Sequence, residues 1–164
     1  MGWAGFQELY KRKERFNIRL LARDSKKNHK MLDKYADDPS VAVIWGDLTR
    51  YEDVLAGVTG SDYVLHVGGM VSPAADYYPE KTLKVNVLAA ENVVKAVQAQ
   101  TNSDDIKVVY IGSVAQYGDR NPPYHWGDVN EPQTPAKFDM YALSKIRSEE
   151  IFAKAGFRNW VSLR

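Results

Sequence analysis

The stretch Lys107-Val108-Val109-Tyr110-Ile111-Gly112-Ser113 indicates the fold, because an apolar run of strand length ends there in a Gly-Ser turn. Apolar residues at helical spacing precede it over 85–100 and follow it over 141–153. A strand that lies between two helices is typical of parallel sheets with right-handed crossovers. The stretch therefore predicts an α/β protein.

The same alternation continues toward both ends of the chain. Further apolar runs of strand length occupy 16–22, 41–45, 63–67 and 160–163. Further helical patterns occupy 1–10, 29–36 and 51–58. Because strands that are buried on both faces read as continuous apolar runs, we predict a doubly wound, Rossmann-like parallel sheet with helices on both sides.

The composition is that of a globular protein. Hydrophobic residues make up 45% of the 164 residues, and 22 basic against 21 acidic residues give a net charge of +1. This balance argues against nucleic acid or a membrane as a partner, and no run approaches the roughly 20 apolar residues of a membrane helix. The chain has no cysteine, which excludes disulfides and thiolate metal ligands. We expect a cytoplasmic protein and predict no metal site.

One long irregular segment, 116–138, interrupts the alternation. It contains four prolines together with Tyr124, His125 and Trp126. Loops of this length inside a compact domain are usually functional. We therefore predict that 116–138 forms an active-site loop.

The residues that directly follow the strands carry the candidate chemistry. In open parallel sheets, ligands bind beyond the carboxyl ends of the strands. This rule brings Arg23, Asp47, the His66-Val67-Gly68-Gly69 segment and Ser113 to one edge of the sheet.

Tyr141 and Lys145 lie four residues apart and therefore on one face of a helix. An ammonium beside a phenol favours the phenolate, which lowers a pKa that starts near 10. Tyr141 could then exchange a proton with a substrate hydroxyl or carbonyl oxygen, which Ser113 would hold. The alternative is an exposed pair on a helix surface.

Several segments, in this order along the chain, resemble motifs of the extended short-chain dehydrogenase/reductase family, also called the NAD-dependent epimerase/dehydratase family. They are Gly46-Asp47-Leu48, His66-Val67-Gly68-Gly69, Asn86-Val87, 111–119, Glu131-Pro132 with Pro135, and Tyr141 with Lys145. The chain departs from the family pattern at Gly68 and Gly69, where the family has alanine. The resemblance covers essentially the whole chain.

The resemblance implies a hydride transfer to or from a nicotinamide. Tyr141 would be the general acid/base, Lys145 would lower its pKa and bind the nicotinamide ribose, and Ser113 would hold the reacting oxygen. The implied cofactor-binding residues are Gly2, Arg23, Asp47, Leu48, His66, Val67, Gly68, Asn86, Tyr141 and Lys145. Structural alternatives stay open: a turn hydroxyl at Ser113, a cap on the 51–58 helix at Asp47 or Thr49, a helix cap at Asn86, and a satisfied strand end at His66.

The end of the 16–22 strand bears on the choice of cofactor. A carboxylate there favours NAD, whereas a guanidinium binds the 2′-phosphate of NADP. Arg23 stands at or next to this position with Lys26 and Lys27 behind it, and Asp24 follows directly. We predict NADP in preference to NAD, with a solvated basic loop as the alternative.

These observations together predict an NAD(P)-dependent enzyme that acts at a carbinol or carbonyl of a small molecule. The Tyr117-Gly118-Asp119 and acidic-proline segments favour a nucleotide sugar and an epimerase or dehydratase, whereas Arg23 favours an NADP-linked carbonyl reductase. The alternative from another class is a non-catalytic NADP-sensing module, against which the intact Ser-Tyr-Lys set argues. The resemblance also implies a homodimer built on the helices at 85–100 and 141–153.

The resemblance calls for a strand that the sequence does not contain. The family's first strand and its Gly-x-x-Gly-x-x-Gly turn should precede the first helix, and Gly2 corresponds only to the last glycine. That strand is central in the usual order, so its absence should leave two strands without a neighbour. We expect 1–164 to be a partial NAD(P)-binding domain that also lacks the C-terminal substrate portion.

Overall fold

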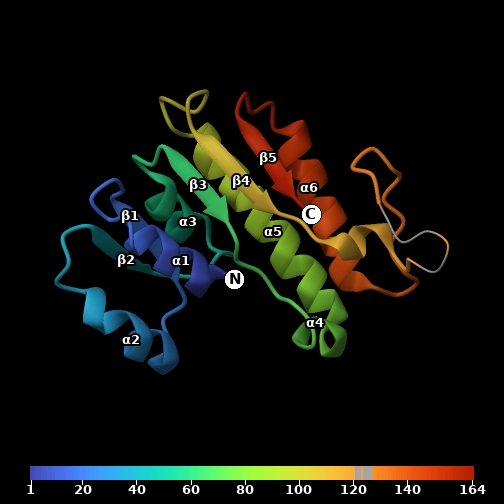
Figure 1. Cartoon of the computed structure of the whole chain (residues 1–164), viewed down its shortest axis with the longest axis horizontal. Coiled ribbons are helices and arrows are strands. Elements are labelled where there is room, and N and C mark those ends of the chain that lie inside the picture. Colours follow the sequence, from blue (N-terminus) through green and yellow to red (C-terminus); the bar gives the residue numbers. More distant parts are fainter. Residues whose placement is uncertain (121–122, 124–126) are drawn as a thin grey trace.

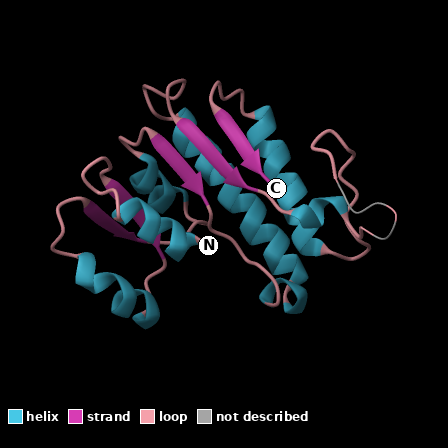
Figure 2. Cartoon of the chain, in the orientation of Figure 1, coloured by secondary structure: helices cyan, strands magenta, loops and turns pink. Residues whose placement is uncertain are grey.

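The structure is a computed structural model that describes residues 1–120, 123 and 127–164. Strands and helices alternate along it (Figures 1 and 2). The strands are β1 (Ile18–Ala22), β2 (Val41–Trp45), β3 (Tyr63–His66), β4 (Lys107–Ile111) and β5 (Trp160–Leu163). The α-helices are α1 (Gly2–Tyr10), α2 (Lys26–Leu32), α3 (Tyr51–Val58), α4 (Ala74–Tyr77), α5 (Pro79–Gln98) and α6 (Met140–Lys154). Two short 3-10 helices are η1 (Asp33–Tyr35) and η2 (Val114–Tyr117).

All strand pairs are parallel, but they form two sheets. β1 pairs with β2, from Ile18 opposite Val41 to Ala22 opposite Trp45. The other sheet has the order β3-β4-β5. Within the described residues no strand joins β1 to β3, which agrees with the expected gap in the sheet. The predicted α/β class with parallel, Rossmann-like strands is confirmed.

The two-stranded sheet is covered on both faces. On one face α1 and α2 enclose a cluster of buried side chains, which are Phe6, Ile18, Leu32, Tyr35 and Val41. Tyr35 meets the rings of Phe6 and Tyr10 edge-on, with centroids 4.9 and 4.8 Å apart. On the other face Leu21 packs against the cluster that contains Val54 and Val58 of α3.

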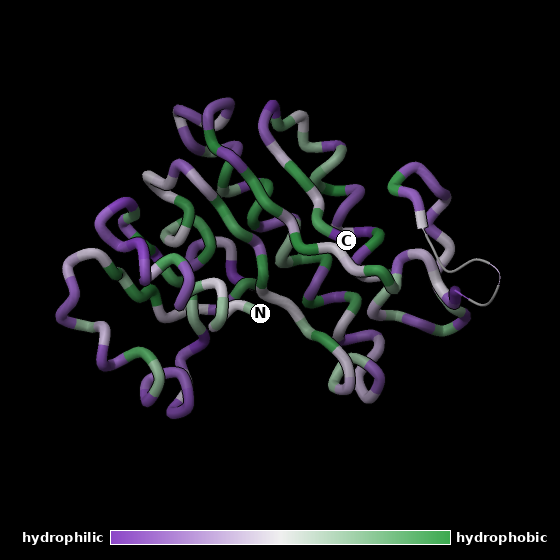
Figure 3. The backbone as a smooth tube through the Cα atoms, viewed as in Figure 1, coloured by the Kyte–Doolittle hydropathy of each residue, from purple (hydrophilic) through white to green (hydrophobic). Residues whose placement is uncertain are grey.

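Among the described residues, the three-stranded sheet is covered on one face only. The side chains between this face and α5 and α6 include Val93, Val97, Val108, Tyr110 and Phe152. The opposite face carries Leu65, Val161 and Leu163, whose side chains are about half exposed, and Figure 3 shows apolar residues along these strands. The predicted burial of every strand on both faces is therefore wrong here, because α1 and α2 lie against the other sheet.

Each predicted strand and helix is present, and the bounds of several of them are shifted. α5 begins at Pro79 rather than at residue 85, because a proline at the first position suits a helix start. Neither Asp47 nor Thr49 caps α3, since the N-cap is Arg50 without a side-chain bond. Asp47 Oδ1 instead accepts hydrogen bonds from the backbone N–H and the hydroxyl of Thr49, at 2.8 and 2.7 Å. The proposed cap was wrong because the chain turns locally before α3 begins.

The active-site loop predicted for 116–138 lies partly outside the described residues. Positions 121–122 and 124–126, which include Tyr124, His125 and Trp126, are not described. The remainder contains the end of η2 and otherwise neither helix nor strand among its described residues.

Candidate active site

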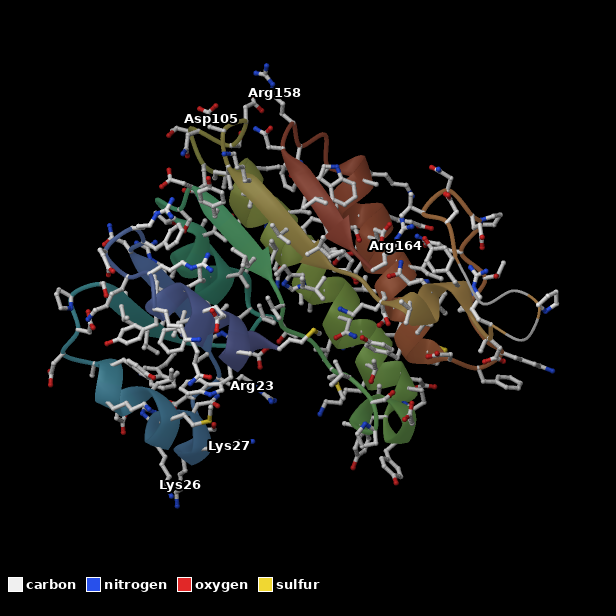
Figure 4. All side chains as sticks on the ribbon, viewed as in Figure 1. Arg23, Lys26, Lys27, Asp105, Arg158 and Arg164 are labelled. Atoms are coloured by element: carbon white, nitrogen blue, oxygen red, sulfur yellow. The ribbon has the colours of Figure 1, made fainter. Side chains whose placement is uncertain are left out.

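The parallel strands bring the predicted site residues to one edge of the molecule. Arg23 follows β1, Asp47 follows β2 after one glycine, and Gly68 and Ser113 lie two residues beyond β3 and β4. In Figure 1 the strand arrows point the same way, and Arg23 in Figure 4 lies at the end to which they point. This is the edge at which open α/β sheets bind ligands.

Lys145 is the cation at the centre of this edge. It is 6% exposed, and its Nζ donates a hydrogen bond to the carbonyl of Ile111 at 2.7 Å. The Nζ lies 5.9 Å from the ring centroid of Tyr141, one turn earlier on α6. Burial lowers the pKa of Lys145 to about 8. An exposed surface pair is therefore the wrong interpretation of Tyr141 and Lys145.

Ser113 begins the turn that follows β4. Its Oγ accepts a hydrogen bond from the backbone N–H of Ala115 at 3.2 Å, so it caps η2. The turn role foreseen for this hydroxyl is present. Accepting that bond leaves the O–H proton able to donate to a ligand oxygen. Because Lys145 Nζ binds the carbonyl of Ile111, the turn lies beside the lysine.

His66 closes the core beneath the site. It is 6% exposed, and its ring packs with those of Tyr110 and Phe152, whose centroids lie 6.0 and 5.8 Å from its own. Burial, with a smaller contribution from the charge of Lys145, lowers the pKa of His66 to about 4. A neutral imidazole packed among rings agrees with the strand-end alternative, and a contact from His66 to a cofactor stays a prediction.

Asn86 links the segment after β3 to α6. Its Oδ1 accepts from the backbone N–H of Met70 at 2.7 Å, and its Nδ2 donates to Met70 O and to Ser144 Oγ at 3.0 and 2.9 Å. Asn86 lies in the interior of α5, so it neither opens nor caps that helix. The helix-cap alternative was wrong because α5 starts earlier, at Pro79.

The glycine at position 68 has a packing reason. A Cβ on Gly68 would stand 2.4 Å from Cδ1 of Leu48, a distance at which one of the two must move. The backbone carbonyl of Leu48 accepts a hydrogen bond from Asn92 Nδ2 at 2.9 Å. Glycine where the family motif has alanine therefore accommodates Leu48, while Val67 lies half-buried beside it.

The loop after β1 and helix α1 carry the predicted site residues that lie nearest the N-terminus. Arg23 is exposed, and it contributes, after the hydrogen bonds from Thr49, to lowering the pKa of Asp47. Asp24 Oδ1 lies 2.9 Å from Nε2 of His29. Lys26 and Lys27 point away from the sheets in Figure 4. Gly2 is the first residue of α1 and is exposed.

Two residues that the sequence analysis missed lie directly behind Ser113. Gln116 is fully buried, and its Nε2 donates to Glu149 Oε2 at 3.0 Å. The spacing of Glu149 gave a usable signal, because it follows Lys145 by four residues as Lys145 follows Tyr141.

The residues present fit a nicotinamide dinucleotide. A buried ammonium with three N–H donors, one of which binds the carbonyl of Ile111 among the described residues, suits a ligand that offers hydroxyl groups. At the other end of the edge, exposed Arg23 beside Asp47 suits a ribose or its phosphate. Among the described residues no three His, Cys, Asp or Glu side chains come together as metal ligands, and no helix there is long and apolar enough to span a membrane.

The fold and this site define a class of protein: a parallel α/β chain with a buried lysine and a half-buried tyrosine, one helical turn apart, at the ligand-binding edge. The model of the NAD dependent epimerase/dehydratase family matches residues 3–162. The chain belongs to that family.

Solved structures of similar fold include enzymes with bound ligands. The UDP-N-acetylglucosamine 4-epimerase from Methanobrevibacter ruminantium M1, in complex with UDP-N-acetylmuramic acid, is 22% identical with a TM-score of 0.70 over 90% of this chain. The WbmH enzyme from Bordetella bronchiseptica in complex with NAD+ is 21% identical with the same TM-score and coverage. RMD from Pseudomonas aeruginosa, complexed with NADPH, is 22% identical over 89% of this chain, with a TM-score of 0.62. The chain spans 46%, 46% and 53% of these three proteins.

Curated relatives fall into two groups. The 3 beta-hydroxysteroid dehydrogenase type 7 of Rattus norvegicus is 31% identical over 121 residues, which are 72% of this chain and 35% of that protein. The UDP-glucose 4-epimerase of Rickettsia massiliae is 34% identical over 80 residues, which are 48% of this chain and 23% of that protein. The chain thus spans about a third or less of these relatives.

Proposed function

We propose that this chain binds NAD(P) and supplies the proton-transfer residues of an epimerase or dehydratase that acts on a nucleotide sugar. The observation that carries the proposal is the buried Lys145 between Tyr141 and the turn at Ser113. A buried cation at this place stabilises charge that develops on a neighbouring oxygen. The nicotinamide, when bound, would accept and return the hydride.

The chain's own part in the reaction is to move a proton. The Tyr141 phenol would exchange its proton with the substrate oxygen, and Lys145, which is cationic below its pKa of about 8, would stabilise negative charge that develops there. Ser113, fixed at the start of η2, would donate its O–H to the same oxygen. Two aimed groups on one oxygen set its position.

The residues that would bind the adenosine half of the cofactor bear on the choice between NAD and NADP. Exposed Arg23, directly after β1, supports a preference for NADP because a guanidinium binds a phosphate through two hydrogen bonds. Asp24, the nearby carboxylate that would repel the phosphate, is paired with His29. The solved relatives in complex with NAD+ and with NADPH are compatible with either cofactor.

A second candidate substrate is a hydroxysteroid or similar apolar carbinol, which an NADP-linked reductase of the same family would process. It is favoured by the similarity to the rat 3 beta-hydroxysteroid dehydrogenase type 7. The epimerase candidate is favoured by the 4-epimerases among the relatives. The non-catalytic sensing module remains the alternative without turnover. A homodimer through α5 and α6 and a cytoplasmic location stay predictions.

Turnover of UDP-glucose and of a 3β-hydroxysteroid, each with NAD+ and with NADP+, tests the proposal. We expect Tyr141→Phe to lose activity by about a hundredfold or more while cofactor binding, followed by fluorescence, changes little. Tyr63→Phe is the matched control, because Tyr63 is an exposed tyrosine at the other end of β3. Cofactor binding without turnover of either substrate, before and after the substitution, would support the sensing module. It would overturn the proposal that the protein is an enzyme.

A further inference from the structure

A chain of buried hydrogen bonds connects the Ser113 turn to α6. The backbone N–H of Ser113 donates to Gln116 Oε1 at 2.7 Å. Gln116 Nε2 donates to Glu149 Oε2 at 3.0 Å. Gln116 is 0% and Glu149 7% exposed, so neither bond competes freely with water.

Glu149 is held in place from several sides. The Nε of Arg164 donates to both carboxylate oxygens, at 3.1 and 3.0 Å, and Arg164 Nη2 pairs with Oε1. Ser162 Oγ donates to Oε2 at 2.8 Å, and Gln133 Nε2 to Oε1 at 3.2 Å. Burial acts to raise the pKa of Glu149, but the bonds from Arg164, Gln116 and Ser162 lower it. The side chain is therefore an anion that only accepts hydrogen bonds.

The charge of Glu149 determines which way the Gln116 amide faces. A carboxylate cannot donate, so the amide must present its NH2 group to Glu149. Its carbonyl oxygen is then left for the backbone N–H of Ser113. Reversal of the amide would set two acceptors against each other at Glu149 and two donors against each other at Ser113.

Glu149 also shares a helix face with the proposed acid/base pair. Tyr141, Lys145 and Glu149 follow one another at intervals of four residues in α6, and such residues lie above one another on one face. One rigid helix thus carries the phenol and, two turns later, the anchor of the serine turn. Arg164, labelled in Figure 4, brings the end of β5 to the same anchor.

The geometry points to Glu149 as a positioning residue that, through Gln116, sets where Ser113 stands relative to Tyr141. Glu149 has no part in proton transfer. It holds the turn that carries the Ser113 hydroxyl at a fixed distance from α6, the helix that carries the Tyr141 phenol. The inference rests on the proposed function for its effect on turnover, but the link to Ser113 can be measured without any substrate.

The test uses an exchange of the two side chains. Gln116→Glu places a second carboxylate against Glu149, and the repulsion should break the bond to the Ser113 N–H. Glu149→Gln removes the charge that orients Gln116. In the double variant Gln116→Glu/Glu149→Gln, an amide again donates to a carboxylate, and the carboxylate again accepts from Ser113. Glu150→Gln is the control, because Glu150 is exposed on the same helix and pairs with Lys154.

Two readouts separate this inference from the proposed function. The first is hydrogen exchange of the Ser113 amide by NMR, which we expect to accelerate about tenfold or more in Gln116→Glu. The second is kcat with UDP-glucose, which we expect to fall by about tenfold or more while the Kd for the cofactor stays within about threefold. Both should recover in the double variant, and the defect of Gln116→Glu should shrink as lower pH protonates the added carboxyl.

The outcomes are distinct. Rapid exchange of the Ser113 amide in the unmodified protein would overturn the link itself. So would exchange that is unchanged in Gln116→Glu, or a folded double variant that does not recover it. A second outcome is that the Ser113 amide shows the expected exchange pattern but no variant turns over substrate. The link from Glu149 to Ser113 would then hold, and the proposed function would be overturned. Loss of folding in one single variant leaves the other single variant and the unmodified protein to decide.

Discussion

The two sheets of this molecule are stabilised in different ways. The β1-β2 sheet relies on an aromatic cluster around Tyr35 and on ion pairs at its surface, such as Lys13 with Asp38. The β3-β4-β5 sheet packs against α5 and α6, where the buried polar groups Asn86, Gln116, Ser144, Lys145, Ser148 and Glu149 lie. Among the described residues, every buried side-chain nitrogen or oxygen atom has a hydrogen-bond partner.

The difference separates a packing unit from a positioning unit. Apolar and aromatic contacts are tolerant of small shifts, whereas a buried hydrogen-bond network is satisfied by one arrangement only. The residues proposed for proton transfer belong to the second sheet, and those proposed for the adenosine end belong to the first. Two of the three histidines, His66 and His29, show the same contrast: His66 is buried with a lowered pKa, and His29 is partly exposed with a raised pKa.

The largest expected effect comes from removing a core ring in the second sheet. Phe152 is 0% exposed and contacts the rings of Tyr110 and Trp160. Phe152→Ala should lower the free energy of unfolding by about 3–5 kcal/mol, because it removes buried surface and leaves a cavity. Denaturant unfolding measures the loss.

Phe6→Ala is the matched substitution in the first sheet, where Phe6 is 4% exposed. No ladder of hydrogen bonds joins the two sheets within the described residues, so hydrogen exchange should rise mainly in β1 and β2 for Phe6→Ala and mainly in β3 to β5 for Phe152→Ala. Equal acceleration of exchange in both sheets for both variants would show that the two sheets unfold as one unit. The contrast between the two sheets would then be wrong.

The next effect is a loss of stability in acid that His66 causes. Its folded pKa of about 4 lies below the ordinary value of 6.5, because burial disfavours the imidazolium and Lys145 repels it. The unfolded state therefore binds more protons, so the stability is fully present above pH 6.5 and is lost as the pH falls toward 4. The shift corresponds to about 3 kcal/mol over that window.

His66→Gln removes this titration, and the comparison concerns slopes rather than absolute stability. We expect the free energy of unfolding of the unmodified protein to fall more steeply between pH 6.5 and 4 than that of the variant. Parallel curves for the two proteins would mean that a group other than His66 takes up the proton. His29→Gln serves as the control, since its imidazole should contribute with the opposite sign.

Much of this arrangement is readable from the sequence. Strand ends mark the ligand-binding edge because all parallel strands point one way, and the spacing of Tyr141 and Lys145 places them together on one helix. The gap between the sheets follows from the order of the motifs. Each of these inferences uses residues close in sequence or a fixed rule of topology.

The remaining features depend on tertiary packing. Gln116 and Glu149 are 33 residues apart, and only the docking of α6 against η2 brings them together. Asn86 was misplaced because Pro79 starts α5 earlier than apolar periodicity indicates. The close approach at Gly68 comes from the Leu48 side chain, which arrives from a different strand end.

The smallest expected effect sharpens the contrast between the histidines. His29 stacks on Trp45, with centroids 3.9 Å apart, and its Nε2 lies 2.9 Å from Asp24 Oδ1. The hydrogen bond that the imidazole donates to Asp24, with a further one to Asp33, raises the pKa of His29 above 6.5. Because the folded pKa is the higher one, this contribution to stability is fully present below pH 6.5 and is lost as the pH rises through the folded value.

NMR titration of the His29 ring measures this pKa directly, and Asp24→Asn should return it toward 6.5 because the carboxylate is its main partner. The accompanying change in thermal stability of His29→Gln should be small, since exposed ion pairs contribute little. An unchanged His29 pKa in Asp24→Asn would mean that Asp24 is free of the ring. The carboxylate would then stand beside Arg23, and the preference for NADP would lose one of its supports.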